Sequence, residues 1–140
     1  MGAISRIIDA NLNRSREGLR VCEDIARFAL NDKSLTSSFK SARHRLTRLS
    51  GRLDSGLALT FSRNVKKDIG RKTSPREKRR KDIKGVFCAN IQRAKESLRS
   101  LEEITKLADK KTADEFKKTR FRVYELEKTS RAKFQALLRG

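Results

Sequence analysis

The sequence has little of what turn-rich, zinc-binding or membrane-spanning proteins need. Its 140 residues include one proline, seven glycines, one histidine, two cysteines and no tryptophan. So few turn-forming residues argue against an all-β protein. His44 stands alone, and Cys22 and Cys88 lack the spacing of metal ligands, so we expect no structural zinc. Apolar runs are only a few residues long, so we also expect no membrane span.

Acidic residues are scarce as well. There are 17 Asp and Glu against 36 Lys and Arg, which gives a net charge of +19 and a pI near 10.8. Charged residues interrupt the apolar N-terminal stretch, so no export signal is expected, and we predict a cytoplasmic protein with reduced thiols. The excess positive charge favours phosphate-bearing or nucleic-acid partners.

An internal repeat is the most informative feature that the sequence does contain. Residues 7–28 align without a gap onto residues 86–107, 79 positions later, and eight of the 22 pairs are identical. Residues 39–46 match residues 116–123 at an offset of 77. Two paired blocks in the same order indicate a duplicated helical hairpin.

Helix-capping signals agree with this repeat. Ser74-Pro75 is typical of an N-cap followed by the first helical residue, and Thr112 with Glu115 forms a capping box. Asn31-Asp32 is expected to end the first helix, with Asp32 or Ser34 capping the second.

The resulting prediction is one all-α domain over residues 1–140, a four-helix bundle of two hairpins with pseudo-two-fold symmetry. Helices are expected at about 5–30, 34–53, 75–108 and 113–138. The domain divides into hairpin one (5–53), a connection (54–74) and hairpin two (75–139).

Polar residues lie on the apolar face of the first helix when it is drawn as a wheel. Asn11 lies near the centre of the apolar arc, Arg14 lies inside it and Glu17 at its edge, and the repeat places Asn90, Arg93 and Glu96 alike. Unpartnered polar groups would be costly to bury. These six side chains are therefore either internal ties between the hairpins or the lining of a phosphate-ligand pocket between them.

Two further pairs of charged residues are repeated between the hairpins. Arg43 and Arg120 flank the apolar stripes of the second helix of each hairpin and are candidate phosphate ligands. Glu23 and Glu102 are expected to face outward and to form surface pairs with nearby arginines on their own helices.

The connection carries the best loop candidates for phosphate and metal contacts. No Walker A loop, GxGxxG motif or kinase signature occurs in the chain. Arg63 and Asp68 are the residues we expect to contact phosphate and Mg²⁺.

The run RIIDANLNRSREGLRVCEDIARF over residues 6–28 closely resembles a known family. It is similar to the helical domain fused to the N-terminus of some bacterial thiamine-phosphate synthases, which also occurs as a stand-alone chain. The resemblance covers nearly the whole chain and continues through Asp68-Ile69-Gly70 and the repeated Asn90-x-x-Arg93. It implies a hydroxymethylpyrimidine-phosphate kinase of thiamine biosynthesis that uses ATP and Mg²⁺.

The resemblance also suggests roles for the candidate residues. Such a phosphoryl transfer needs positioning and positive charge more than a nucleophilic side chain. Phosphates would be held by Arg14, Arg93 and Arg63, with Asn11 or Asn90 reading the aminopyrimidine. The catalytic carboxylates would be Glu17, Glu96 and Asp68, the last holding Mg²⁺.

Two other functions remain open at this point. A charge of +19 exceeds what a few phosphates require, so a basic helical nucleic-acid-binding module is the first alternative. Asn64 follows Arg63 where the family leads us to expect an acid, so a catalytically inactive scaffold relative is the second. A separate thiamine-phosphate synthase and a second copy of this chain are the candidate protein partners.

Overall fold

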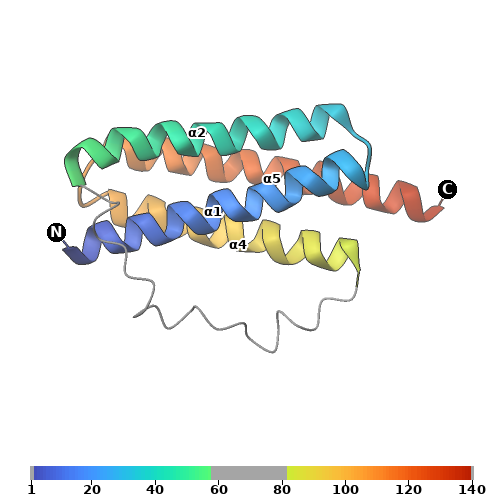
Figure 1. The fold of residues 1–140 in the computed structure, drawn as a ribbon, viewed down its shortest axis with the longest axis horizontal. Helices are drawn as coiled ribbons and strands as arrows, with labels where there is room; N and C mark the ends of the chain where they lie inside the picture. The colour runs from blue at the N-terminus through green and yellow to red at the C-terminus, as the bar shows by residue number, and fades with distance from the viewer. Residues whose placement is uncertain (1, 58–81, 140) are drawn as a thin grey trace.

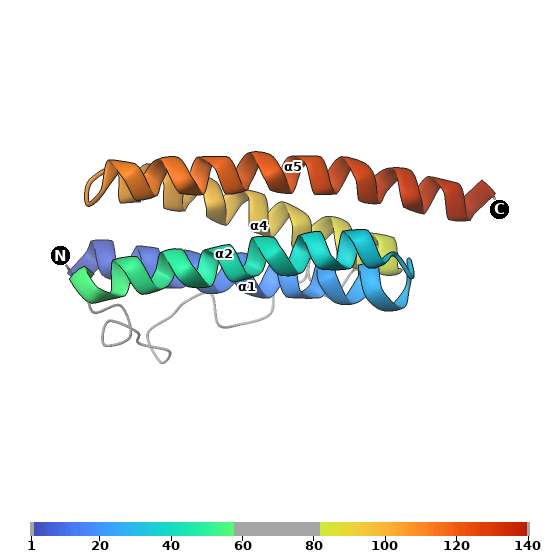
Figure 2. The same cartoon turned by 90° about the horizontal axis from the view of Figure 1, so that it is seen from above.

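The computed structural model describes residues 2–57 and 82–139, which form an antiparallel bundle of four long helices. They are α1 (Gly2–Phe28), α2 (Lys33–Leu57), α4 (Ile83–Thr105) and α5 (Lys110–Arg139). Helices α1 and α5 each pack against both α2 and α4, so the four helices form a ring around one core (Figure 1). The described ranges contain no strand, and the prediction of an all-α bundle is confirmed. Seen from above, the end of α5 extends beyond the other helices (Figure 2).

The core residues of α1 and α4 recur at alternating steps of four and three residues. This 3.5-residue average is typical of helices that pack side by side with a shallow left-handed twist. The α4 set lies 79 residues after the α1 set, so the sequence repeat is also a repeat of burial. The fully buried positions are Ile8, Leu12, Ser15, Leu19, Cys22 and Ala26 in α1, and Phe87, Ile91, Ala94, Leu98, Leu101 and Thr105 in α4.

Helices α2 and α5 follow the same rule at the offset of 77 residues. The buried positions that the two helices share include Leu35, Phe39, Ala42, Leu46, Leu49 and Leu53 in α2, and Thr112, Phe116, Thr119, Val123, Leu126 and Ser130 in α5. The two hairpins therefore fill the core from equivalent positions. A two-fold axis relating them stays a prediction.

The helix starts are set by aspartates. Asp32 accepts a hydrogen bond from the Leu35 backbone N–H at 2.9 Å and caps α2 as predicted, directly after Asn31 adopts a left-handed φ of 50°. Asp109 accepts a hydrogen bond from the Lys111 backbone N–H at 3.1 Å and another from the Thr112 hydroxyl. The prediction that Thr112 caps the last helix is therefore wrong by one turn, because the acid upstream takes this role.

Helix α4 begins at Ile83 in the described part of the chain, where Asp82 accepts a hydrogen bond from the Gly85 backbone N–H at 2.6 Å. The predicted start at Ser74-Pro75 lies outside the described residues. Among the helices described, none is both long and apolar enough to cross a membrane.

Candidate functional site

Asn11 and Asn90 occupy buried, equivalent positions on α1 and α4. Each side chain donates from its Nδ2 to the carbonyl oxygen one turn earlier, Ile7 for Asn11 and Val86 for Asn90, and both distances are 2.8 Å. The side chains are 7% and 8% exposed. Within the described ranges nothing donates to either Oδ1 atom, so each amide keeps an acceptor available.

Arg14 and Arg93 are exposed, so the prediction that they point into the bundle is wrong. The two leucines of α1 are buried as predicted, and Ser15 and Gly18 are buried beside them, so the buried face lies on the side of the helix away from Arg14. The described carboxylates form no ion pair with either arginine. Both guanidinium groups are thus open to solvent at equivalent positions of the repeat.

Glu17 and Glu96 are exposed too, one turn further along their helices. Glu96 accepts a hydrogen bond from Gln92 at 2.9 Å. The structure does not join either glutamate to the neighbouring arginine. The internal ties between Asn, Arg and Glu that the wheel allowed are therefore absent from the described residues.

The contact between α1 and α4 is close because small residues meet there. A Cβ atom on Gly18 would lie 2.8 Å from the Asn90 backbone oxygen, and the hydroxyl oxygens of Ser15 and Ser97 are 2.6 Å apart. Such packing leaves no room between the two helices at this level. A ligand held by Arg14 and Arg93 would have to bind on the outer surface of α1 and α4.

Glu23 and Glu102 are buried rather than outward-facing, at 3% and 4% exposure, so their prediction as surface residues is wrong. The predicted pair of Glu102 with an arginine of its own helix does form, with Arg99 at 3.1 Å. Glu23 accepts a hydrogen bond from Arg43 Nε at 3.0 Å, which ties α1 to α2. Glu102 accepts from Arg120 Nε at 3.1 Å and lies 3.0 Å from its terminal nitrogen, which ties α4 to α5. Buried charges persist in proteins when they are paired in this way.

Arg120 has further partners that fix its guanidinium. It donates to the Tyr124 hydroxyl at 2.8 Å and lies 4.9 Å from the centre of the Phe121 ring. Burial lowers the pKa of Arg120, but the hydrogen bonds with Tyr124 and Glu102 outweigh it and raise that pKa above its usual value. For Arg43 and Arg120, this geometry favours an internal tie over the predicted phosphate contact.

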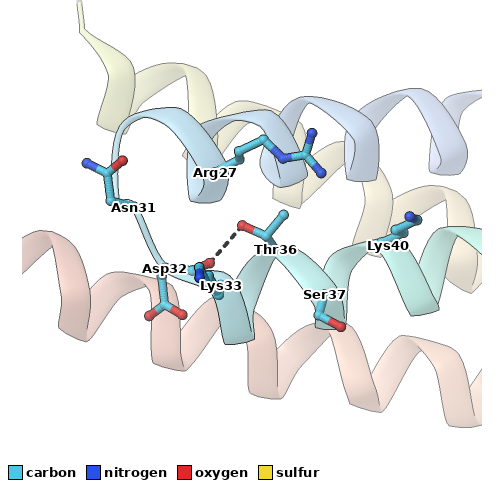
Figure 3. A pocket seen from close by; sticks show the side chains of 7 residues that line it. All are labelled: Arg27, Asn31, Asp32, Lys33, Thr36, Ser37 and Lys40. Carbon is cyan, nitrogen blue, oxygen red and sulfur yellow. Dashed lines mark hydrogen bonds between the residues drawn. The ribbon is translucent and has the colours of Figure 1, made fainter.

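A pocket that the sequence did not predict lies at the connection between α1 and α2 (Figure 3). Its volume is about 580 Å³. It is lined by Arg27, Asn31, Asp32, Lys33, Thr36, Ser37 and Lys40. The Thr36 hydroxyl donates to the Asp32 carbonyl oxygen at 2.7 Å. The three cations and the Ser37 hydroxyl make this lining suited to an anion.

Metal ligands are sparse in the part of the chain that the structure describes. That part holds no group of three or more His, Cys, Asp or Glu side chains able to bind a metal ion. Arg63 and Asp68, the predicted phosphate and Mg²⁺ contacts, lie outside the described residues. Cys22 is buried and Cys88 half-buried, and burial raises the pKa of the Cys22 thiol, so it stays protonated.

Residues 6–129 match the ThiD2 family. The chain is 41% identical over 126 residues to a thiamine-phosphate synthase of Synechocystis sp., covering 89% of this chain and 35% of that protein. It is 40% identical over 125 residues to that of Nostoc punctiforme (89% and 34%) and 39% identical over 122 residues to that of Rhodopirellula baltica (86% and 32%). The chain thus spans about a third of these relatives. No solved structure matches it.

Proposed function

Because the chain belongs to the ThiD2 family, we propose that it acts in thiamine biosynthesis as an ATP-dependent hydroxymethylpyrimidine-phosphate kinase. The name of the relatives supports the pathway, and the resemblance of residues 6–28 to a kinase-type domain supports the reaction. In that reaction the bond between the terminal phosphoryl group and ADP breaks. A new bond forms to a phosphate oxygen of the substrate, which becomes a diphosphate. The place of action would be the cytoplasm.

The observation that carries this proposal is the pair of unpartnered arginines, Arg14 and Arg93. The other repeated arginines make ion pairs: Arg43 with Glu23, and Arg120 with Glu102. Arg14 and Arg93 make none among the described residues, so the fold has no evident use for their guanidinium groups. A guanidinium donates two parallel hydrogen bonds to a phosphate, which suits a reaction between two phosphate-bearing substrates.

The neighbouring repeated residues fit supporting roles. The free Oδ1 of Asn11 or Asn90 can accept a hydrogen bond from the exocyclic amine of an aminopyrimidine. Glu17 and Glu96, each three residues after an arginine, would orient the transferring groups. Positioning of this kind supplies most of the catalysis in phosphoryl transfer.

Magnesium and ATP belong to the proposal through the resemblance. Mg²⁺ in such sites is held by one or two carboxylates together with phosphate oxygens, and it neutralises charge on the phosphates. The described residues offer no carboxylate cluster for it. We assign this task to Asp68, with Arg63 as a phosphate contact; both lie outside the described residues.

The decisive experiment is an assay of the purified protein with ATP, Mg²⁺ and hydroxymethylpyrimidine phosphate, read by mass spectrometry for the diphosphate. Arg14→Met and Arg93→Met keep the apolar stem of the side chain and remove the donors. Each should weaken transition-state binding, measured as kcat/KM, by about 1.5–3 kcal/mol, the range for a hydrogen bond to a charged group. The melting temperature should stay unchanged, because neither arginine is buried.

Arg48→Met is the matched control, since Arg48 is another exposed arginine without an ion pair among the described residues, placed on α2. It should leave kcat/KM unchanged. A folded Arg14→Met, Arg93→Met double variant with full turnover would refute the phosphate role. An inactive wild-type protein would point to the scaffold alternative, in which the chain serves a separate thiamine-phosphate synthase.

Nucleic-acid binding remains the second candidate because of one surface feature. Phe121 and Tyr124 are 49% and 37% exposed on α5, in ring contact at 5.8 Å, with the basic Lys117 and Lys128 on the same helix. Exposed rings among cations can stack bases. A gel-shift titration separates this function from the kinase, because charge-driven binding falls steeply with salt. Tight RNA or DNA binding at physiological salt without kinase turnover would favour it.

A further inference from the structure

We propose that the pocket between the end of α1 and the start of α2 binds the phosphate group of a small phosphorylated molecule, at a site separate from Arg14 and Arg93. The proposal goes beyond the kinase function. It depends on the charge of the pocket, on its counterpart in hairpin two and on the use of Asp32.

The three cations of the pocket are not neutralised by the fold. Arg27 comes from α1, and Lys33 and Lys40 come from α2. None of them makes an ion pair with a described carboxylate. Arg27 only lies over the Phe28 ring, 5.8 Å from its centre. Figure 3 shows the Thr36 side chain below Arg27, with Lys40 one turn further along α2.

The single carboxylate in the lining is already used elsewhere. The Asp32 side chain caps α2 through the Leu35 backbone N–H and pairs with Lys133 of α5 at 3.3 Å. Figure 3 shows this carboxylate turned away from Arg27 and Lys40. The Leu35 N–H donates to the Asp32 side chain and the Thr36 N–H to the Asp32 carbonyl oxygen. Few backbone donors remain at the start of α2, so an incoming anion would be bound mainly by side chains.

The equivalent positions of hairpin two differ in their ion pairing. Lys106, the counterpart of Arg27, is paired with Glu103 at 2.9 Å. The counterpart of Glu103 in hairpin one is Asp24, which pairs with Arg20 at 3.5 Å and leaves Arg27 without a partner.

One acid of hairpin two has no acidic counterpart in the pocket. Ser37 lines it, whereas the equivalent position of hairpin two holds Asp114, which pairs with Lys118 at 3.4 Å. The two hairpins thus differ at two positions of this corner: Arg27 is unpaired where Lys106 is paired, and Ser37 stands where hairpin two has Asp114. Lys110 and Lys117, the counterparts of Lys33 and Lys40, make no ion pair among the described residues either. Hairpin two packs with one more carboxylate at this corner, so the bundle does not require the extra positive charge of hairpin one, and binding explains it better.

The expected ligand is a small anion with one or two phosphate groups. A volume of about 580 Å³ admits a molecule of metabolite size. One guanidinium, two ammonium groups and the amide of Asn31 provide donors but few acceptors, which suits phosphate oxygens. Every residue of the lining has a polar or charged side chain, so recognition would depend on the phosphate more than on an apolar body.

Inorganic pyrophosphate is the probe for this site, added to the whole chain at 0.15 M KCl so that diffuse surface attraction is screened. Amide resonances of Asn31, Lys33, Thr36 and Ser37 should shift in heteronuclear NMR spectra. The Arg27→Gln, Lys40→Gln double variant should lose these shifts and should bind pyrophosphate at least about tenfold more weakly by calorimetry, because two charged donors are gone.

The matched control is Lys106→Gln, Lys117→Gln, which removes the same charge from the equivalent positions of hairpin two. It should change the affinity by less than about twofold, a bound set by screening of distant charges. Equal weakening in both double variants, or no shift at the four pocket amides, would overturn the proposal.

Turnover measured on the same variants separates this inference from the kinase function. Arg27→Gln, Lys40→Gln should retain kinase activity, because neither residue belongs to the Arg14 and Arg93 surface. Loss of pyrophosphate binding and of turnover together would refute a separate site. The binding test keeps its meaning even if the wild-type protein shows no kinase activity.

Discussion

The two hairpins build the same core from different residues and differ most where their helices connect. Both bury a glutamate against an arginine of the next helix, Glu23 with Arg43 and Glu102 with Arg120. Both cap their second helix with an aspartate, Asp32 or Asp109 in their respective hairpins.

The connections diverge because hairpin one is two residues longer, as the offsets of 79 and 77 require. The extra length accommodates Asn31 at a φ of 50° and leaves the pocket beside it. Repeated residues that pair with each other inside the fold therefore report what the bundle needs. Repeated residues without such a partner, and positions that differ between the hairpins, are the ones available for binding.

The largest expected effect comes from breaking the buried ion pairs. Glu102→Leu leaves the Arg120 guanidinium buried without its carboxylate and should cost about 3–5 kcal/mol of unfolding free energy. Glu23→Leu should cost less, because the side chain of Arg43 is 19% exposed against 11% for Arg120 and reaches water more easily. Urea unfolding of both variants measures the difference.

Glu103→Leu on the same helix is the control, since the Glu103 side chain is 48% exposed. Equal stability of the Glu102 and Glu103 variants would show that burial does not determine how much the ion pair of Glu102 with Arg120 contributes to the unfolding free energy.

The next effect concerns the close contact of α1 and α4. Gly18→Ala would place a Cβ atom 2.8 Å from the Asn90 backbone oxygen and should cost about 1–3 kcal/mol through overpacking. Its repeat counterpart Ser97 already carries a side chain, so Ser97→Ala should cost only about 1 kcal/mol for the hydrogen bond with Ser15.

Thermal or urea unfolding tests this through the sign of the change in unfolding free energy of Gly18→Ala. Without the clash, alanine would stabilise the helix by roughly 0.5–1 kcal/mol relative to glycine. A more stable Gly18→Ala protein would therefore contradict the close approach of the two helices.

The smallest effect is the pH dependence of the two helix caps. The hydrogen bond from the Leu35 N–H is the main cause that lowers the pKa of Asp32, and that from the Thr112 hydroxyl lowers the pKa of Asp109, both below the usual 3.8. A lowered folded-state pKa stabilises the protein above the unfolded value, and this stabilisation is lost as the pH falls through the folded value.

Asp32→Asn and Asp109→Asn test this, because asparagine still caps a helix but carries no charge. Each variant should melt below the wild type at pH 7, and the gap should close once the pH falls well under 3.8. A gap that is independent of pH would show that the cap acts only through its hydrogen bond.

Most of the fold could be predicted from the repeat, whereas the direction of its polar residues could not. The apolar positions of α1 were identified correctly where residues are large, as at Leu12 and Leu19. Arg14 was misplaced because Ser15 and Gly18, which look neutral in sequence, lie against α4. A prediction that used a 3.5-residue spacing and counted small residues as buried would have placed Arg14 on the exposed side of α1.

The sequence alone determined the helices, the duplication and the family of this chain. Helix caps, hydrophobic spacing and repeated residues act locally or pairwise, so they can be read along the chain.

Only the tertiary structure decided which charged side chains form ion pairs inside the fold. Glu23 meets Arg43 twenty residues away, while Arg27 and Lys40 meet no carboxylate among the described residues. Ion pairing depends on which helices become neighbours and how they are rotated. That is set by the packing of all four helices together, so a single helix drawn as a wheel cannot reveal it.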